Sequence, residues 1–257
     1  MMDPDSLVLL DVADGVAVLT LNRPDARNAL SPELIALLQL LCAQCDARED
    51  VAAMVLIGAD PAFCGGIDLK RLAAGTSGAV TLIGDSAFPA HRKPIIGAIN
   101  GAAVTGGLEL ALACDFLIAS ERARFGDTHA RVGVMPGWGL TVALPQAIGL
   151  RRSKQMSLTG NYVDAATAHA WGLVNEVVAH EELLPRARQL ALDIASIRPA
   201  CVQEIRSIYD EVALRIGDEA RLFETQRSRR WMAEQFDRDQ LATDREDIVR
   251  RGRSQLS

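Results

Sequence analysis

Residues 99–115 read Ile-Asn-Gly-Ala-Ala-Val-Thr-Gly-Gly-Leu-Glu-Leu-Ala-Leu-Ala-Cys-Asp, and this run determines how the rest of the chain is interpreted. An apolar strand over residues 94–100 leads into a glycine-containing turn, and the turn opens a helix. The helix carries one acid, Glu109, with no residue of opposite charge one helical turn away. A carboxylate among apolar residues is typical of a general acid or base, although a solvated acid on a helix of small residues fits the same pattern.

Strands and helices alternate on both sides of this run. Short aliphatic runs separated by Ala-Asp-Gly predict a hairpin, and Ser31-Pro32-Glu33 predicts a helix start, with serine as the cap. Further strands are expected at 53–58 and 115–120, and a helix at 140–148. Such alternation is typical of an α/β fold containing βαβ units.

From Arg151 onward helices dominate, with one short strand expected near residues 174–178. We therefore predict an α/β core over residues 1–198 and a C-terminal helical region over residues 199–257. Long polar helices at a terminus often cover a neighbouring subunit. The helices are expected at 151–158, 164–170, 181–197, 200–214, 218–235 and 243–251.

Composition narrows the class of protein. The 257 residues are 49% hydrophobic and 23% charged, as in an ordinary globular protein that buries a substantial core. A net charge of −6 argues against a nucleic-acid surface. The acidic start has no basic region followed by an apolar stretch, and no apolar run reaches membrane-spanning length, so a cytoplasmic location is expected.

Five cysteines at irregular spacing favour free thiols over a disulfide framework. Cys42-Ala-Gln-Cys45 matches a CxxC pattern, which can mark a metal or redox site. No second pair and no nearby histidine accompany it, and it lies late in a leucine-rich helix. A packed helix face is the preferred interpretation, and no metal site is predicted.

The sequence has no GxSxG, Walker A or HExxH motif, which disfavours an α/β-hydrolase, a nucleoside-triphosphate enzyme and a zinc protease. Two glycine-rich turns remain, at residues 65–68 and 105–108. Each is expected at a strand-to-helix junction, where backbone N–H groups lack partners. Two such groups converging on one point would bind a carbonyl oxygen that becomes negative, which is an oxyanion hole.

Three stretches carry a common pattern: Leu-Asn-Arg-Pro-Asp-Ala-Arg-Asn-Ala-Leu at 21–30, Phe-Cys-Gly-Gly-Ile-Asp-Leu-Lys at 63–70, and residues 99–115. Together they resemble the crotonase, or enoyl-CoA hydratase/isomerase, superfamily. Supporting matches occur at 133–137 (Gly-Val-Met-Pro-Gly) and 168–174 (Ala-His-Ala-Trp-Gly-Leu-Val), so the likeness spans about residues 7–180. The resemblance implies a crotonase-like spiral of ββα units followed by a helical region.

The resemblance implies that the backbone N–H groups of Ile67 and Gly106 form an oxyanion hole for an acyl-CoA thioester. Gly65, Gly66, Ile67 and Asp68 would line the path of the adenine and pantetheine. Arg23 and Lys70 would contact CoA phosphates, with isolated surface cations as the alternative. No separate cofactor is implied, because coenzyme A enters as part of the substrate.

Glu109 falls on the first of the two catalytic glutamates of the hydratases, but His129 stands where the second belongs. His129 either replaces that acid, since histidine titrates near neutral pH, or lines the pocket without a proton role. Gly137 fills the place where a dehalogenase-like member carries its nucleophilic aspartate, which argues against that activity. Trp138 is expected to close the acyl pocket, with core packing as the alternative.

The leading hypothesis is an enoyl-CoA hydratase that adds water to a 2-trans-enoyl-CoA in fatty-acid degradation. An isomerase or hydrolase using the same oxyanion hole, and a non-catalytic acyl-CoA-binding paralogue, are kept as alternatives. The resemblance also implies a homotrimer or a dimer of trimers, with neither nucleic acid nor membrane as a partner.

Overall fold

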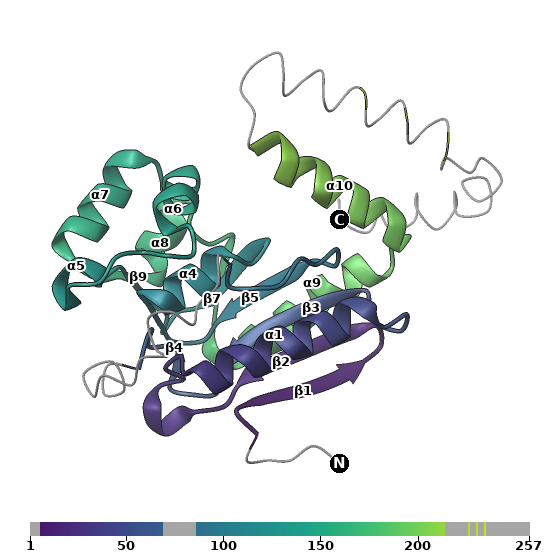
Figure 1. Cartoon of the computed structure of the whole chain (residues 1–257), viewed down its shortest axis with the longest axis horizontal. Helices are drawn as coiled ribbons and strands as arrows, with labels where there is room; N and C mark the ends of the chain where they lie inside the picture. The colour runs from purple at the N-terminus through teal and green to yellow at the C-terminus, as the bar shows by residue number, and fades with distance from the viewer. Residues whose placement is uncertain (1–5, 69–85, 214–225, 227–229, 231–233, 235–257) are drawn as a thin grey trace. The chain divides into compact units, whose positions relative to one another are not determined.

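The computed structural model describes residues 6–68 and 86–213, together with Gln226, Arg230 and Glu234 (Figure 1). The chain forms two compact units, residues 1–203 and 204–257. The division falls inside helix α10 (Pro199–Ala213), and every strand found in the described residues belongs to the first unit. The boundary expected at residue 198 stays a prediction.

The larger sheet has six strands, and the predicted hairpin forms one edge of it. β1 and β2 pair antiparallel with Val8 opposite Leu21, and the other neighbours pair in parallel. The strands expected at 53–58, 94–100 and 115–120 are confirmed. In sheet order the strands are β1 (Val8–Ala13), β2 (Val16–Leu21), β3 (Ala53–Gly58), β5 (Ile95–Ile99), β7 (Phe116–Ser120) and β10 (Glu176–Val178).

A second sheet of four short strands carries the turns around the site. After each of β3, β5 and β7 the chain crosses directly into this smaller sheet, as β4, β6 and β8. This alternation of strands between the two sheets fits the spiral of ββα units that the resemblance implied, and the α/β crotonase-like fold is confirmed. The strands are β4 (Ala62–Cys64), β6 (Ala102–Val104), β8 (Arg124–Gly126) and β9 (Val163–Asp164).

Ser31 caps the first long helix as predicted, because its Oγ accepts a hydrogen bond from Leu34 N at 3.3 Å. The same helix buries Cys42 and Cys45, so the CxxC pattern is a packed helix face with free thiols. The helices are α1 (Pro32–Ala47), α4 (Gly106–Leu112), α5 (His129–Val132), α6 (Leu140–Ile148), α7 (Leu150–Thr159), α8 (Ala165–Trp171), α9 (Leu183–Ala195) and α10, with 3-10 turns η1 (Pro24–Ala26) and η2 (His180–Glu182).

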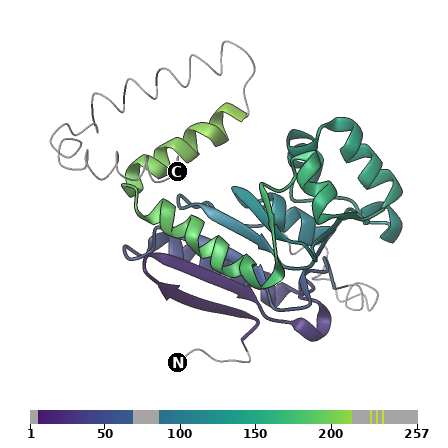
Figure 2. The ribbon, with the colours of Figure 1, turned by 180° about the vertical axis from the view of Figure 1, so that it is seen from behind.

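The core lies on both faces of the larger sheet, because side chains of each strand alternate between them. On β2, Leu19 and Leu21 join the cluster that α1 covers (Figure 1), whereas Val16 and Val18 join the cluster that α9 covers (Figure 2). Burial on both faces explains why these strands are nearly continuous apolar runs. Within the described ranges, no helix combines the length and the apolar character needed to cross a membrane.

Candidate active site

Thr105 connects the smaller sheet to α4 in a strained backbone conformation. Its φ of 55° is rare for a threonine, and its ψ is −115°. Two contacts hold it there: its N–H donates to Gly126 O on β8 at 2.9 Å, and its Oγ1 lies 2.6 Å from Thr128 Oγ1. The start of α4 is therefore fixed to the segment that follows β8.

The two glycine-rich turns press against each other. A Cβ added to Gly66, whose φ is +86°, would lie 2.6 Å from Val104 O, and one added to Gly107 would lie 2.2 Å from Cys64 O. Neither distance leaves room for a side chain next to backbone atoms. Glycine is thus required at positions 66 and 107, where the turn after β4 contacts the beginning of α4.

This close approach brings together Ile67 and Gly106, the two residues to which the family resemblance assigns the oxyanion hole. A Cβ added to Gly106 would lie 3.8 Å from Ile67 N. Among the described residues, neither N–H donates a hydrogen bond to a protein acceptor. Gly65 N, by contrast, donates to Arg27 O at 2.9 Å and so anchors the turn.

Glu109 lies in the first turn of α4 and is 4% exposed, which rules out the solvated-acid alternative. One carboxylate oxygen, Oε1, accepts hydrogen bonds from the backbone N–H groups of Gly137 at 3.0 Å and Trp138 at 2.8 Å. The other oxygen, Oε2, lies 3.5 Å from His129 Nε2. The two oxygens of Glu109 therefore differ in chemistry: main-chain donors occupy Oε1, and Oε2 faces a titratable ring.

His129 stands between two carboxylates. Its Nε2 faces Glu109, and its Nδ1 lies 2.6 Å from Asp127 Oδ1. Burial alone would lower the pKa of His129, but hydrogen bonding to Asp127 and Glu109 and their negative charges outweigh that effect and raise the pKa to about 9. A pKa raised in this way favours the imidazolium form at neutral pH, in which each ring nitrogen carries a proton.

Asp127 is the site residue that the sequence reasoning missed. It is 1% exposed, and it also accepts the backbone N–H of His129 at 3.1 Å. Burial acts to raise the pKa of its carboxyl, but hydrogen bonds from His129 and from Ser157 on α7 prevail and lower it. The available signal was the Asp-Thr-His spacing at 127–129, directly after a glycine.

The remaining predicted site residues are placed as follows. Arg23 donates to Ala29 O at 2.6 Å and pairs with Asp68 at 3.2 Å, so the two residues stabilise each other at the β4 turn. Trp138 is 9% exposed and follows Gly137 in the turn that holds Glu109. Lys70 lies outside the described residues, as does most of the segment 75–93 that was expected to be a loop or mobile helix.

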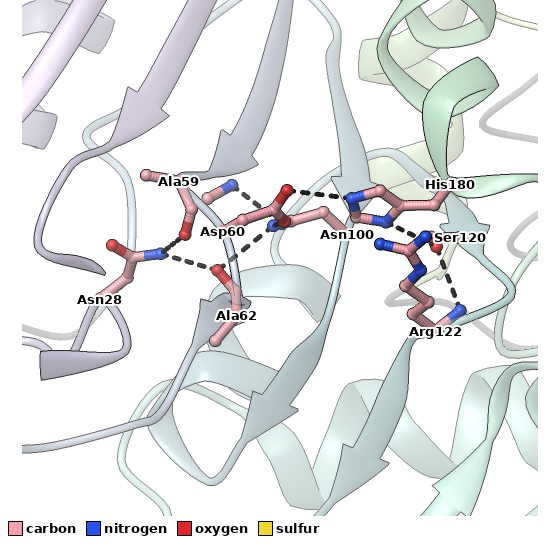
Figure 3. A network of polar contacts seen from close by, with 9 residues as sticks. Asn28, Ala59, Asp60, Ala62, Asn100, Ser120, Arg122 and His180 are labelled. Carbon is pink, nitrogen blue, oxygen red and sulfur yellow. Dashed lines mark hydrogen bonds and ion pairs between the residues drawn. The ribbon is translucent and has the colours of Figure 1, made fainter. Parts of the chain in front are cut away.

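A second polar network holds the turn between β3 and β4 (Figure 3). Asp60 accepts a hydrogen bond from Asn100 Nδ2 at 2.8 Å and lies 3.0 Å from His180 Nε2, and the other ring nitrogen of His180 lies 3.0 Å from Ser120 Oγ. Burial of the Asp60 carboxyl acts to raise its pKa, but Asn100, His180 and the charge of Arg122 lower it.

Asn28 secures the same turn from the opposite side. Its Nδ2 donates to Ala59 O and Ala62 O, both at 2.7 Å, and its Oδ1 accepts from Arg23 N at 2.8 Å. The network thus ties the sheet ends to the strand that leads into Gly66 and Ile67. Within the described part of the chain, no cluster of histidine, cysteine and acidic side chains has the arrangement of a metal site.

Comparison with known proteins agrees with this geometry. Residues 11–238 match the model of the family described as enoyl-CoA hydratase/isomerase. A probable peroxisomal enoyl-CoA hydratase 1 of Arabidopsis thaliana is 39% identical over 206 residues, which cover 77% of this chain and 76% of that protein. The (E)-benzylidenesuccinyl-CoA hydratase of Thauera aromatica is 44% identical over 202 residues, or 76% of this chain and 79% of that protein.

A solved structure extends the match to three dimensions. An enoyl-CoA hydratase from Mycobacterium smegmatis is 46% identical and superimposes with a TM-score of 0.76, covering 89% of this chain and 99% of the other. The family match covers most of the sequence, including both glycine turns, Glu109 and His129. The chain belongs to the enoyl-CoA hydratase/isomerase family.

Proposed function

We propose that the protein adds water across the double bond of a 2-trans-enoyl-CoA in fatty-acid degradation. The observation that carries the proposal is the buried carboxylate of Glu109, whose Oε2 lies 3.5 Å from Nε2 of the buried His129. The N–H groups of Ile67, in the turn after β4, and of Gly106, at the start of α4, have no protein acceptor among the described residues and lie close to each other. A general base, a general acid and a pair of oxyanion donors are the groups that hydration of a conjugated thioester needs.

The N–H groups of Ile67 and Gly106 would bind the thioester oxygen. Addition of hydroxide to C3 moves the π electrons of the double bond onto that oxygen, giving an enolate. Donors that are already oriented stabilise this charge without reorganising, and each such donor is worth about 3 kcal/mol in the transition state. The close packing at Gly66 and Gly107 fixes the two turns in advance.

Glu109 would act as the general base and His129 as the general acid. Oε2 takes a proton from water while the oxygen attacks C3, and Nε2–H of the imidazolium protonates C2 of the enolate. Burial lowers the pKa of His129, but its hydrogen bonds to Asp127 and Glu109 and their negative charges prevail and raise it to about 9, so the imidazole carries the proton it would donate at physiological pH. A histidine in this setting can replace a second carboxylic acid.

The substrate contacts proposed from the family likeness complete the site. Gly65, Gly66 and Asp68 would line the coenzyme A path, with Arg23 and Lys70 at the phosphates. Gly137 and Trp138 would lie beside the acyl chain. Coenzyme A would be the only cofactor-like group, and the protein would work in the cytoplasm as a homotrimer or a dimer of trimers.

The test uses crotonyl-CoA and a 3-enoyl-CoA as substrates for the purified protein. Glu109→Gln keeps an oxygen for the N–H groups of Gly137 and Trp138 but removes the base, so hydration should fall by at least about 100-fold while thioester binding is retained. Conversion of the 3-enoyl-CoA alone would identify an isomerase, and thioester cleavage a hydrolase. Binding without turnover of any thioester would identify a non-catalytic paralogue and refute the proposal.

A further inference from the structure

Asp127, His129 and Glu109 form a continuous chain of ionisable groups from two parts of the fold, the segment after β8 and helix α4. Asp127 follows β8, His129 begins α5, and Glu109 lies on α4. The distances are 2.6 Å from Asp127 Oδ1 to His129 Nδ1 and 3.5 Å from His129 Nε2 to Glu109 Oε2. All three side chains are buried, so water screens these charges poorly.

The shorter of the two contacts is the one farther from the expected substrate. A separation of 2.6 Å is typical of a strong charge-assisted hydrogen bond. The same Oδ1 accepts the backbone N–H of His129 at 3.1 Å, so Asp127 holds both the ring and the main chain of the histidine. Rotation of the ring would break the bond to Nδ1 inside a buried site, and the orientation of Nε2 is thereby fixed.

We infer that Asp127 is a positioning residue for the proposed hydration, which keeps His129 doubly protonated with its Nε2–H directed at Glu109 Oε2. This inference rests on the proposed function. Without Asp127, a neutral imidazole could carry its single proton on Nδ1 and present a lone pair where the acid must donate. Asp127 therefore selects the form of His129 that can protonate C2.

The same arrangement allows the site to reset after each addition. Hydration leaves Glu109 protonated at Oε2 and His129 neutral at Nε2, because one took a proton from water and the other gave one to C2. These two atoms are 3.5 Å apart, so the proton gained by Glu109 can return to His129 through a small approach of the side chains. The starting charges are restored, and no proton is exchanged with bulk solvent.

The charged groups around His129 support this assignment. Asp127 and Glu109 act on the ring from two sides, and Ser157 of α7 donates to Asp127. Arg131, on the same short helix as His129, is directed elsewhere: its guanidinium donates to Thr159 O at 2.7 Å and to Asn161 Oδ1 at 2.8 Å. The two carboxylates are thus the groups that set the protonation of His129.

The test compares the full-length protein with Asp127→Asn. The asparagine keeps the size and one acceptor oxygen but removes the charge. We expect the pH at which half of His129 is deprotonated, followed by NMR of the ring protons, to fall by about 1 to 3 units from about 9. The decrease of kcat at alkaline pH, its alkaline limb, should shift to lower pH by the same amount. If its midpoint reaches pH 7, kcat at pH 8 falls about tenfold, while KM should stay within about twofold of its original value.

Two comparisons separate positioning from mere structural support. Ser157→Ala removes the neighbouring hydrogen bond but keeps the carboxylate, so its alkaline limb should shift far less. His129→Gln identifies the His129 resonance and should abolish the limb. If Asp127→Asn folds and the titration midpoint of His129 does not shift, the inference is overturned. If the variant does not fold, a His129 midpoint near 6.5 in the unsubstituted protein overturns it instead. Failure of the proposed function is distinct, because it appears as absent turnover in the unsubstituted protein whatever the NMR midpoint.

Discussion

Raising the pH should remove stability that His129 contributes to the fold. The pKa of His129 is about 9 in the folded protein and about 6.5 when unfolded, so folding is favoured by the proton that the ring retains. The contribution is fully present below pH 6.5, declines by about 1.4 kcal/mol per pH unit above it, and is lost above pH 9. The interval corresponds to about 3 kcal/mol, a large part of the stability of a typical domain.

Urea denaturation at several pH values measures this loss. The protein and His129→Gln share every other titrating group, so the difference between their free energies of unfolding isolates the histidine. Between pH 6.5 and pH 9.5 the free energy of unfolding of the unsubstituted protein should fall by about 3 kcal/mol more than that of His129→Gln. If the two curves remain parallel over this range, His129 does not carry a raised pKa, and the charge chain with Asp127 and Glu109 is wrong.

Two substitutions test the frame around the site. Gly66→Ala places a Cβ 2.6 Å from Val104 O at a φ of +86°. This substitution should lower the free energy of unfolding by about 1–3 kcal/mol and should also lower kcat. Gly137→Ala is the control: its added Cβ would have no atom within 4 Å, so the free energy of unfolding should change by less than about 1 kcal/mol. Equal melting temperatures would contradict the close approach. Asn28→Ala removes the amide that donates to Ala59 O, which is partly buried, and to Ala62 O, which keeps a 3.4 Å contact from Asn100 Nδ2. The substitution should cost about 1–3 kcal/mol in urea unfolding, and a loss below about 0.5 kcal/mol would show that these hydrogen bonds contribute little.

The fold was largely predictable because its main strands carry strong local signals. β2 and β3 are apolar on both faces, and Ser31-Pro32 marks the start of α1 by a cap that forms as expected. The strands of the smaller sheet were not predicted, because two or three residues cannot display a period. Ala102–Val104, for example, was interpreted as part of a turn although it pairs with both β4 and β8.

The site was predictable where glycine or an isolated charge marks it. Glu109 was conspicuous among apolar neighbours, and the two glycine pairs indicated a close backbone approach that the structure displays. Asp127 was missed because its role depends on a ring that tertiary folding alone brings beside Glu109. The hydrogen bonds from the backbone of residues 137 and 138 could not be predicted either, because every residue type except proline has the same backbone N–H donor.

Those backbone donors have a consequence for how the enzyme can diversify. Glu109 is held at Oε1 by main-chain N–H groups, which persist when the side chains at 137 and 138 change. The hydrogen bonds that hold Oε1 therefore involve no atom of residue 129, which faces the other oxygen. During evolution residue 129 can change between histidine and an acid while the hydrogen bonds to Glu109 Oε1 are kept. The group that donates the second proton can therefore change without rebuilding the rest of the site.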